Sequence, residues 1–365
     1  MSQMLALRGL EGEATPRFMS IDVPDVAEDE VLVQIKSAGL SAGTFSLLAA
    51  GMVRPLPMTL GHEGAGIVAA VGSAVHAFKP GDRVRIHPTL SCGGCRYCLS
   101  GRDQMCAGSS IIGFIATGTQ RIEAHARYRD GCLAEFVRVP QRQIDLLADH
   151  VSFDIGAKIQ YLGNAMRALR VARLPPASTL MILGPTGAMG VATIKLARFF
   201  GVQHLVLVGR STARLNEVKA LSDVRTEVFS TEALGDDWVA SDALARAITR
   251  HIPDGVDAAV DYLPAGGDLW QALGALATGA TLVNMGAGPI PFAMTMRAIV
   301  GKCLNIVGSR NHSRLDAQEV IGLLAEGSLR ADELITHRHR LERVEEAIQQ
   351  LLRRSESVWM SVVHP

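Results

Sequence analysis

Four cysteines lie within fifteen residues at a spacing that suits one metal ion. They form a C-x-x-C-x-x-C-x7-C run, whose members are Cys92, Cys95, Cys98 and Cys106. Four thiolates can converge tetrahedrally on zinc and leave no open coordination position, so we expect a structural zinc that fixes a loop at about residues 91–107. An iron–sulfur cluster is the competing interpretation, but no second cysteine group or characteristic proline follows. The two other cysteines, Cys132 and Cys303, are expected to be ordinary buried thiols.

A glycine-rich segment has the composition of a phosphate-binding turn. Directly after an apolar run and before a predicted helix, the chain has Gly184-Pro185-Thr186-Gly187-Ala188-Met189-Gly190. Gly184 permits a tight turn, and Gly187 and Gly190 let the backbone approach a pyrophosphate and the helix approach the sheet. Thr186 replaces the usual middle glycine and could donate its hydroxyl to a phosphate oxygen. We predict that these residues bind a dinucleotide; a glycine-rich turn without a ligand is the alternative.

The next predicted strand ends in residues that favour NADP over NAD. An acidic side chain would hold the ribose of NAD at this point, but the chain has Val208-Gly209-Arg210-Ser211. Gly209 leaves room for a 2′-phosphate, and Arg210 can offer it a forked guanidinium, assisted by Ser211 and Arg214. The alternative is that Arg210 stacks on the adenine or faces solvent.

The elements that must carry these motifs fall into two regions. Residues 1–150 contain short apolar runs broken by glycine and proline, which is typical of a mostly β domain. From about Thr179 apolar strands alternate with helical segments, which indicates βαβ units, a parallel sheet and an α/β fold class. The strands expected there are residues 180–183, 205–208, 257–260, 281–285 and 304–307, with a helix at 188–200. The tail predicts helices at 317–325 and 343–352 and a strand at 358–363.

Size and charge limit the function classes. A chain of 365 residues exceeds what one hydrophobic core usually supports, so two domains are expected. Lysine plus arginine and aspartate plus glutamate number 36 each, which leaves no global field to attract nucleic acid or an anionic membrane. Residues 1–10 lack a secretory signal, and glycine and proline break the uncharged stretch 269–296, so no transmembrane segment is predicted. We expect a soluble, cytoplasmic protein whose partner is a small-molecule substrate.

These motifs resemble the medium-chain dehydrogenase/reductase superfamily, and within it the zinc-containing alcohol dehydrogenases, over essentially the whole chain. Further segments that carry the resemblance are Gly61-His62-Glu63-Gly64-Ala65-Gly66, Asp130-Gly131-Cys132-Leu133-Ala134-Glu135-Phe136, Asp257-Ala258-Ala259-Val260-Asp261 and Ile335-Thr336-His337. The resemblance implies a GroES-like, β-rich catalytic domain made of residues 1–155 and 310–365. It also implies a Rossmann domain at 156–309, with a doubly wound parallel sheet that binds NADP, and a homodimer or homotetramer. The nicotinamide is expected near Gly286, Ala287, Gly308 and Ser309, and we add Asn164 to the cofactor-binding residues.

The sequence departs from the family pattern at the catalytic metal. Ser41 stands where the family usually has a cysteine ligand, and Gln160 stands where it has a second thiolate or a carboxylate. Of the usual ligands only His62 is unchanged. Gly43 takes the place of the hydroxyl that usually relays the alcohol proton, and the neighbouring Thr44 could substitute for it.

These replacements remove the negative charge that a catalytic zinc needs. The family's site neutralises the ion with two cysteine thiolates and adds one histidine. The hydroxyl of Ser41 is not ionised at neutral pH and the carbonyl of Gln160 is neutral, which leaves Glu63 as the only obvious local anion. We therefore favour a neutral, hydrogen-bonded His62; a zinc held by His62, Glu63 and water is the alternative.

A retained cofactor site beside a depleted metal site favours reduction without a Lewis acid. We predict an NADPH-dependent oxidoreductase that transfers a hydride to a small conjugated carbonyl, quinone or activated alkene. The residues expected to act in catalysis are Ser41, Thr44, His62, Glu63 and Tyr161. Two alternatives stay open: a zinc-dependent alcohol dehydrogenase or carbonyl reductase, and a non-catalytic NADPH-binding protein. Loops 45–57 and 111–128 are expected to shape the substrate pocket.

Overall fold

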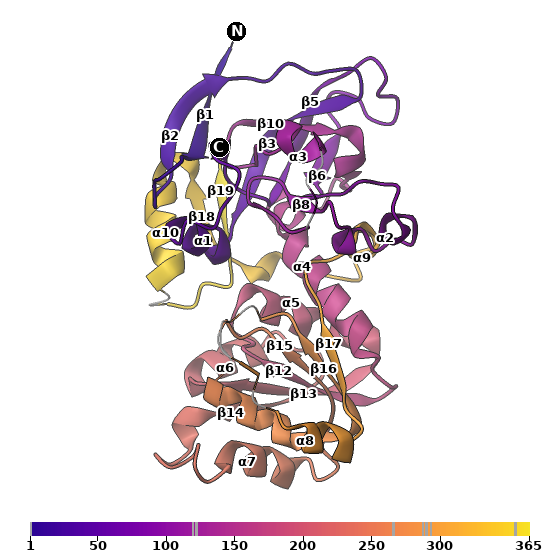
Figure 1. Cartoon of the computed structure of the whole chain (residues 1–365), viewed down its shortest axis with the longest axis vertical. Coiled ribbons are helices and arrows are strands. Elements are labelled where there is room, and N and C mark those ends of the chain that lie inside the picture. Colours follow the sequence, from indigo (N-terminus) through magenta and orange to yellow (C-terminus); the bar gives the residue numbers. More distant parts are fainter. Residues whose placement is uncertain are drawn as a thin grey trace. The chain divides into compact units, whose positions relative to one another are not determined.

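The chain divides into two compact units. The computed structural model describes residues 2–118, 120, 123–264, 267–286, 288, 291–292, 294–353 and 356–365. The first unit comprises Met1–Gln160 and His312–Pro365, and the second comprises Tyr161–Asn311. The long helix α4 (Phe153–Ala172) begins in the first unit and ends in the second (Figure 1). In the described part of the chain, no helix combines the length and apolar character needed to cross a membrane.

The first unit is built mainly from antiparallel strands. Among its described residues, the largest sheet has the order β11-β6-β5-β3-β19-β18, with β10 also paired to β3. Two small sheets, β2-β1-β4 and β7-β8-β9, complete the unit. The strands are β1 (Gln3–Gly9), β2 (Arg17–Asp22), β3 (Glu30–Leu40), β4 (Met58–Thr59), β5 (Gly64–Val71), β6 (Arg83–Ile86), β7 (Thr89–Leu90), β8 (Ser110–Ile111), β9 (Ile115–Ala116), β10 (Phe136–Pro140), β11 (Ile144–Leu146), β18 (Ile335–Arg340) and β19 (Met360–His364). Besides part of α4, its helices are α1 (Ala42–Ala49), α2 (Arg96–Leu99), α3 (Glu123–Arg127), α9 (Arg314–Ala325) and α10 (Val344–Arg353).

Both ends of the chain contribute to this unit because β19 pairs with β3. The register places Ser361 opposite Leu40 and Val363 opposite Ala38. The central strand β3 is buried along most of its length, as expected for a strand that pairs on both sides. Helix α10 turns Val344, Ala347 and Ile348 inward, at the three- and four-residue spacing of an amphipathic helix.

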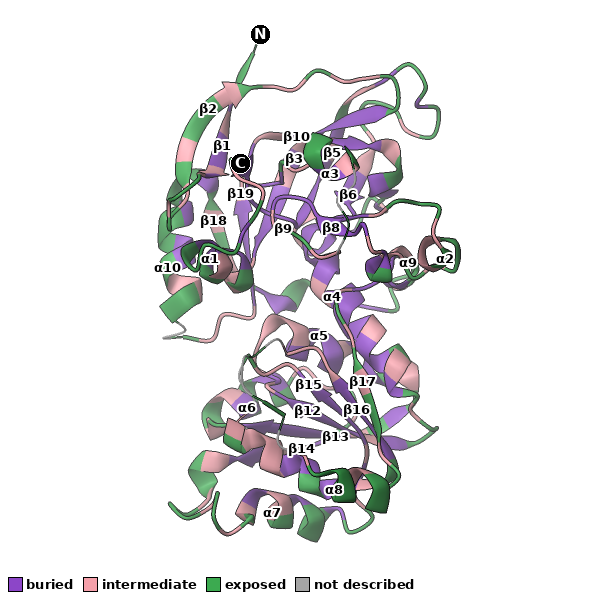
Figure 2. Ribbon diagram, in the orientation of Figure 1, coloured by how far each residue is buried: buried purple, intermediate pink, exposed green. Residues whose placement is uncertain are grey.

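The second unit contains a parallel sheet with the strand order β14-β13-β12-β15-β16-β17. Numbered along the chain from β12, this is the order 3-2-1-4-5-6 of the doubly wound dinucleotide-binding fold. Figure 2 shows the inner strands β12, β13 and β15 largely buried, while the edge strand β17 and helix α8 are largely exposed. The strands are β12 (Ser178–Leu183), β13 (Val202–Gly209), β14 (Arg225–Ser230), β15 (Val256–Asp261), β16 (Leu276–Asn284) and β17 (Asn305–Gly308). The helices are α5 (Ala188–Leu196), α6 (Thr212–Lys219), α7 (Ala243–His251) and α8 (Met296–Gly301).

Two details of the second unit differ from the sequence-based expectation. The helix expected at 188–200 is α-helical only to Leu196 and continues as a 3₁₀ turn over Ala197–Phe200, which ends at Gly201 with a φ of 72°. Strand β14 was not predicted. It lies at the edge of the sheet and carries polar residues such as Arg225 and Glu227, so its sequence lacks the apolar run of a central strand.

Candidate functional site

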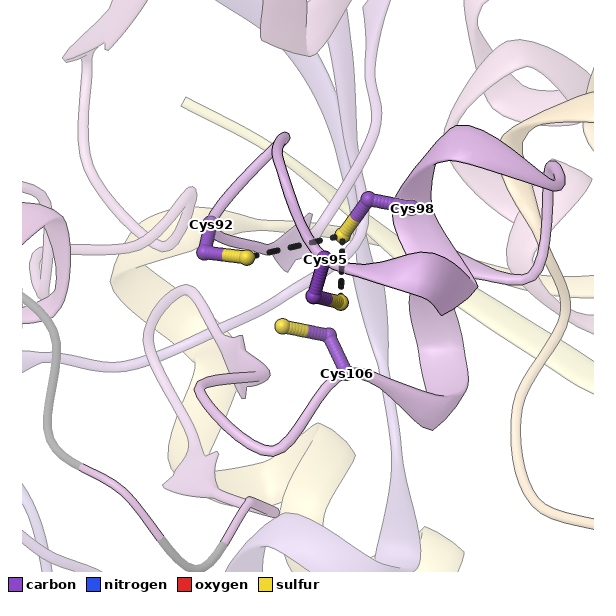
Figure 3. Close-up of side chains that lie close together, drawn as sticks. All are labelled: Cys92, Cys95, Cys98 and Cys106. Carbon is purple, nitrogen blue, oxygen red and sulfur yellow. Dashed lines mark hydrogen bonds between the residues drawn. The ribbon is translucent and has the colours of Figure 1, made fainter.

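The four cysteines of the predicted zinc site come together in the first unit. Their Sγ atoms all lie within 4.8 Å of one another, and Figure 3 shows the four sulfurs facing a common centre. The Sγ of Cys98 is 3.9 Å from that of Cys92 and 3.6 Å from that of Cys95. A tetrahedron with zinc–sulfur bonds of about 2.3 Å has sulfur–sulfur edges of about 3.8 Å, so the arrangement fits a zinc ion. None of the four forms a disulfide.

The four thiols differ in how easily they lose the proton that a metal must replace. Hydrogen bonds from the amides of Gly94 and Cys95 lower the pKa of Cys92 to about 6. Burial raises the pKa of Cys98 to about 12. Zinc binds thiolates and not thiols. At neutral pH Cys92 is already a thiolate, whereas Cys98 would lose its proton only when zinc binds.

A network of buried charged side chains connects the segment that carries the four cysteines, residues 92–106 (the cysteine lobe), to the largest sheet. The Nη2 of Arg85 lies 2.9 Å from Asp145 Oδ2 and 3.2 Å from His87 Nδ1. The Nε2 of His87 lies 3.3 Å from Asp103 Oδ2, and Asp103 lies between Cys98 and Cys106 in the sequence. Arg314, at the start of α9, meets Asp145 at 2.6 Å. Strands β6 and β11, helix α9 and the lobe thus share one set of paired charges.

Three predicted catalytic residues meet around His62. This residue lies between β4 and β5, and its ring stacks on Phe114 with the ring centroids 5.0 Å apart. Its Nδ1 is 3.4 Å from Thr44 Oγ1 on α1, and its Nε2 is 3.5 Å from Glu63 Oε1. Burial lowers the pKa of His62 below its ordinary value, although the Glu63 carboxylate acts in the opposite direction. Burial thus favours the neutral form of the ring.

The other two positions of the usual catalytic metal supply no anion. Ser41 is the residue before α1, and its side chain does not cap that helix. Gln160 lies on α4 and is buried, and its Oε1 has no hydrogen-bond partner in the described part of the chain. Within the same part of the chain, the four cysteines are the only group of three or more His, Cys, Asp and Glu side chains that could hold a metal ion. At these usual ligand positions the described residues therefore offer a metal no anionic side chain.

Lys158 is a functional candidate that the sequence analysis missed. Its Nζ donates to Glu63 Oε2 over 2.6 Å and to the carbonyl of Leu40 over 3.0 Å, and its side chain is 0% exposed. The carboxylate of Glu63, expected to be the local anion available to a metal, is thus already paired with a cation. A lysine in the middle of an apolar helical run was the available signal, because a buried lysine needs a partner.

The glycine turn in the second unit has the geometry predicted for a dinucleotide. Gly184 has a φ of 74°, which favours glycine, and it directly follows β12. A Cβ at Gly187 would meet no atom within 4 Å, so the turn is open there, in front of the first residues of α5. A Cβ at Gly190 would lie 2.4 Å from the carbonyl oxygen of Pro185, so this glycine lets helix and turn approach closely. The turn therefore fits a pyrophosphate at the N-terminus of α5.

The predicted 2′-phosphate residues follow β13. Arg210 is exposed, Ser211 precedes α6, and Arg214 lies within that helix. The carbonyl of Arg210 accepts a hydrogen bond from Ser230 Oγ over 2.5 Å, which ties this loop to the end of β14. Gly209 has a packing role that was not predicted, because a Cβ there would lie 3.2 Å from Leu215 of α6.

The loops predicted near the nicotinamide are organised by Asp261 at the end of β15. Its carboxylate accepts from Trp270 Nε1 over 2.7 Å, and its carbonyl accepts the amide of Gly286 over 3.1 Å. Burial raises the pKa of Asp261. The amide of Ser309 donates to Asn284 over 2.9 Å, and a Cβ at Gly308 would meet nothing within 4 Å.

Two further predicted residues, Tyr161 and Asn164, lie on the part of α4 that belongs to the second unit. Asn164 Nδ2 donates to the sulfur of Met189 over 3.6 Å, which links α4 to the first turn of α5. Tyr161 is the first residue of the second unit and is half-buried. Ala287 lies outside the described residues. Ser41, Thr44, His62 and Glu63 therefore belong to the first unit, while Tyr161 and the predicted cofactor residues belong to the second.

A cavity of about 940 Å³ opens in the first unit. It is lined by residues from both loops that were expected to shape a substrate pocket, together with the turn after β1. Its wall combines apolar side chains such as Leu48 and Leu56 with charged ones such as Arg54 and Glu123.

One expectation about the remaining cysteines is wrong. Cys132 is buried, and burial raises its pKa to about 12. Cys303, expected to be buried, is exposed. It has a φ of 51° in the turn after α8, which leads to the edge strand β17, and both α8 and β17 are themselves largely exposed.

Two family models match the chain. The alcohol dehydrogenase GroES-like domain matches residues 27–149, and the zinc-binding dehydrogenase family matches residues 188–326. A protein named probable D-xylulose reductase A of Aspergillus terreus is 27% identical over 348 residues, which covers 94% of this chain and 93% of its own. Sorbitol dehydrogenase of Bacillus subtilis is 27% identical over 356 residues, covering 96% and 94%.

Solved structures share the whole fold. A Sinorhizobium meliloti protein described as a zinc-binding dehydrogenase and bound to NADP has 26% identity and a TM-score of 0.86, with both chains fully covered. A thermostable alcohol dehydrogenase from Pyrobaculum aerophilum, with cobalt and zinc bound, has 23% identity and a TM-score of 0.81, again over both full chains. These matches confirm the expected α/β fold with a GroES-like and a Rossmann domain.

Proposed function

Since the chain belongs to the zinc-containing, alcohol dehydrogenase-like branch of the medium-chain dehydrogenase/reductase superfamily, we propose that it is an NADPH-dependent reductase with one structural zinc and no catalytic zinc. Its substrate would be a small conjugated carbonyl, a quinone or an activated alkene. Membership makes the chain an oxidoreductase; the cofactor choice, the substrate class and the missing catalytic metal are the parts proposed here.

One observation carries the proposal: the carboxylate of Glu63 is bonded to Lys158 over 2.6 Å in the protein interior. A second zinc near His62 would need anionic ligands, and Ser41 and Gln160 provide none. Breaking a buried ion pair to free Glu63 would leave an unpaired lysine, at a cost of about 3–5 kcal/mol. Glu63, the anionic ligand that a zinc-dependent mechanism would need, is therefore already paired with Lys158.

NADPH supplies the hydride when it is bound, and residues of the second unit account for its binding. The open turn at Gly187 and the first amides of α5 fit the pyrophosphate. The exposed guanidinium of Arg210 can bind a 2′-phosphate in a fork. The NADP bound to the Sinorhizobium meliloti protein supports this cofactor choice.

In the first unit, hydroxyl groups and His62 provide the donors that a metal-free reduction needs. Hydride addition to a conjugated acceptor places negative charge on the substrate oxygen as an enolate or a hydroquinone anion. Neutral donors such as Thr44 and Ser41 can stabilise that charge by hydrogen bonds, without a Lewis acid. In the second unit, the hydroxyl of Tyr161 is a further candidate donor. A simple ketone would give an alkoxide, which is more basic than an enolate or a hydroquinone anion and so depends more on a Lewis acid. We therefore propose an activated acceptor.

The test is zinc stoichiometry combined with turnover. Protein purified without added metal is expected to contain one zinc per chain and to oxidise NADPH with 2-alkenals or quinones. A chelator that leaves the fold intact should not reduce this rate. Two zinc ions per chain, or turnover that a chelator abolishes and zinc restores, would contradict the proposal.

The second candidate function is a zinc-dependent alcohol dehydrogenase or carbonyl reductase. The names of the relatives favour it, because D-xylulose reductase and sorbitol dehydrogenase act on polyols and their ketones. It predicts two zinc ions and turnover with sorbitol or xylitol. A third candidate, a non-catalytic NADPH-binding protein, predicts NADPH binding without turnover of alkenals, quinones, aldehydes or alcohols.

Assembly and location stay predictions. The family resemblance predicts a homodimer or homotetramer, and the exposed Ile306 on the edge strand β17 is compatible with a partner strand. Light scattering after gel filtration tests this, and a monomer at micromolar concentration would contradict it. We also predict a cytoplasmic location.

A further inference from the structure

Four residues form a continuous line of polar contacts inside the first unit. The Nζ of Lys158 bonds to Glu63 Oε2 over 2.6 Å, and Glu63 Oε1 lies 3.5 Å from His62 Nε2. On the other side of the ring, His62 Nδ1 lies 3.4 Å from Thr44 Oγ1. All four residues are buried. Thr44, His62 and Glu63 were predicted to act in catalysis. Lys158 was not, because it is distant from them in the sequence and only the fold brings it next to Glu63.

The carboxylate of Glu63 is held on one oxygen and open on the other. Lys158 bonds to Oε2, whereas Oε1 makes no hydrogen bond within the described part of the chain and faces His62. A carboxylate next to a ring nitrogen of histidine fixes the orientation of the imidazole and determines which nitrogen carries the proton. The open oxygen of Glu63 is therefore placed to accept from His62 Nε2, which leaves Nδ1 for Thr44.

Neighbouring groups hold the Lys158–Glu63 ion pair in a single arrangement. Lys158 also donates to the carbonyl of Leu40 over 3.0 Å, so its ammonium is held from two sides. A Cβ at Gly39 would lie 2.0 Å from Glu63 Oε2 and 2.8 Å from Lys158 Nζ. The ion pair thus fills the space that a glycine at position 39 leaves beside β3.

We propose that Lys158 is a positioning residue for the reaction and acts on His62 through Glu63. As a fixed cation in the interior, it keeps Glu63 Oε1 directed at His62 Nε2, so that the ring presents Nδ1 to Thr44. The same bond denies the carboxylate to a metal ion. This assignment rests on the proposed function, because it requires His62 to be free of metal.

The first test compares Lys158→Met, which keeps the length of the side chain and removes its charge, with Lys79→Met, which changes an exposed lysine. In Lys158→Met, kcat is expected to fall about 10–100-fold, as for other residues that orient a catalytic group. The KM for NADPH should change less than about 2-fold, since the cofactor residues are untouched. The ¹⁵N spectrum of His62 should change from one tautomer to a mixture. Lys158→Ala should recover turnover when ethylammonium is added.

Zinc titration gives a second readout that does not depend on turnover. In excess zinc, the wild type is expected to retain one ion per chain. Lys158→Met should take up a further equivalent, because Glu63 is then free beside His62. The double variant Glu63→Gln/Lys158→Met should lose that equivalent again.

A folded Lys158→Met protein with wild-type kcat, an unchanged His62 spectrum and one zinc would overturn the inference. If Lys158→Met does not fold, the double variant leaves no unpaired charge in the interior and permits the same ¹⁵N measurement. A second zinc in the wild type would instead contradict the proposed function, and this is seen before any variant is made.

Discussion

The backbone amide of Arg314 donates to Oδ1 of Asp103 over 3.0 Å, although 211 residues separate them in the sequence. Asp103 belongs to the cysteine lobe and Arg314 is the first residue of α9. In the same region, a Cβ at Gly101 would lie 2.4 Å from Leu315 Cδ1, so lobe and helix are in close contact. The cysteine lobe therefore supports the packing of α9 as well as its own loop, and the loss of its structure should affect the whole unit.

Cys106→Ser should remove the zinc and destabilise the protein. A serine hydroxyl does not replace a thiolate as a zinc ligand, and the large apolar side chains Leu99 and Met105 of the lobe are exposed, so they add little to its stability. We expect less than one zinc per chain and a Tm lower by roughly 6–12 °C, which corresponds to about 3 kcal/mol for a domain of this size. Atomic absorption and calorimetry measure both. Cys303→Ser, which changes an exposed thiol outside the lobe, is the control and should leave both values unchanged.

Stability should fall on mild acidification, in part because of His87. Burial lowers the pKa of His87 below its ordinary value, although Asp103 acts in the opposite direction. Below about pH 6.5 the unfolded chain therefore binds a proton that the folded chain does not, and the free energy of unfolding decreases as the pH falls. Above about pH 6.5 His87 is neutral in both the folded and the unfolded chain, so its titration does not change the free energy of unfolding there.

His87→Gln tests the pH dependence, because glutamine can still donate to Asp103 but does not titrate. Urea unfolding between about pH 7.5 and about pH 5 should give a shallower slope for the variant, by at most about 1.4 kcal/mol per pH unit for one proton. Equal slopes in the wild type and the variant would show that His87 contributes nothing to the pH dependence.

Gly187→Val should abolish cofactor binding without harming the fold. The new Cβ would meet no protein atom within 4 Å, and the φ of −100° at this position suits valine, but the side chain would fill the space predicted for the pyrophosphate. We expect the NADPH affinity to fall at least about 10-fold, or about 1.4 kcal/mol, with an unchanged Tm. Fluorescence titration and calorimetry measure these.

Gly190→Ala is the matched comparison for the glycine turn. Its Cβ would lie 2.4 Å from the Pro185 carbonyl oxygen, so the turn and α5 must move apart. We expect destabilisation of about 1–3 kcal/mol from this overpacking. If both variants lowered the Tm equally, Gly187 would have a structural role and the open turn would not be a binding site.

Arg210→Ala should weaken NADPH binding and spare NADH binding. Hydrogen bonds to a charged group contribute about 1.5–3 kcal/mol, so the Kd for NADPH should rise about 10–150-fold. Arg225→Ala changes another exposed arginine of the same unit and should have no effect. An equal loss of affinity for both cofactors would mean that Arg210 stacks on the adenine and does not select the phosphate.

Local sequence was sufficient for the features that depend on short-range geometry. The cysteine spacing predicted a lobe whose sulfurs do converge, because the ligands lie close together along the chain. The strand–turn–helix setting predicted the glycine turn, since a φ of 74° at Gly184 and an open face at Gly187 are properties of a few consecutive residues. The alternation of apolar strands and helices predicted the parallel sheet for the same reason. It missed β14, whose polar edge sequence has no such pattern.

The sequence by itself determined the family, the fold class and the loss of two metal ligands, because these depend on residue types at fixed spacings. Only the tertiary structure decided what Glu63 does. Its partner Lys158 is 95 residues away, and the two meet because the pairing of β3 with β5 brings Gly39 beside Glu63 while α4 carries the lysine to them. Such a contact depends on strand register and on interior space left by a single glycine, and no local pattern encodes either.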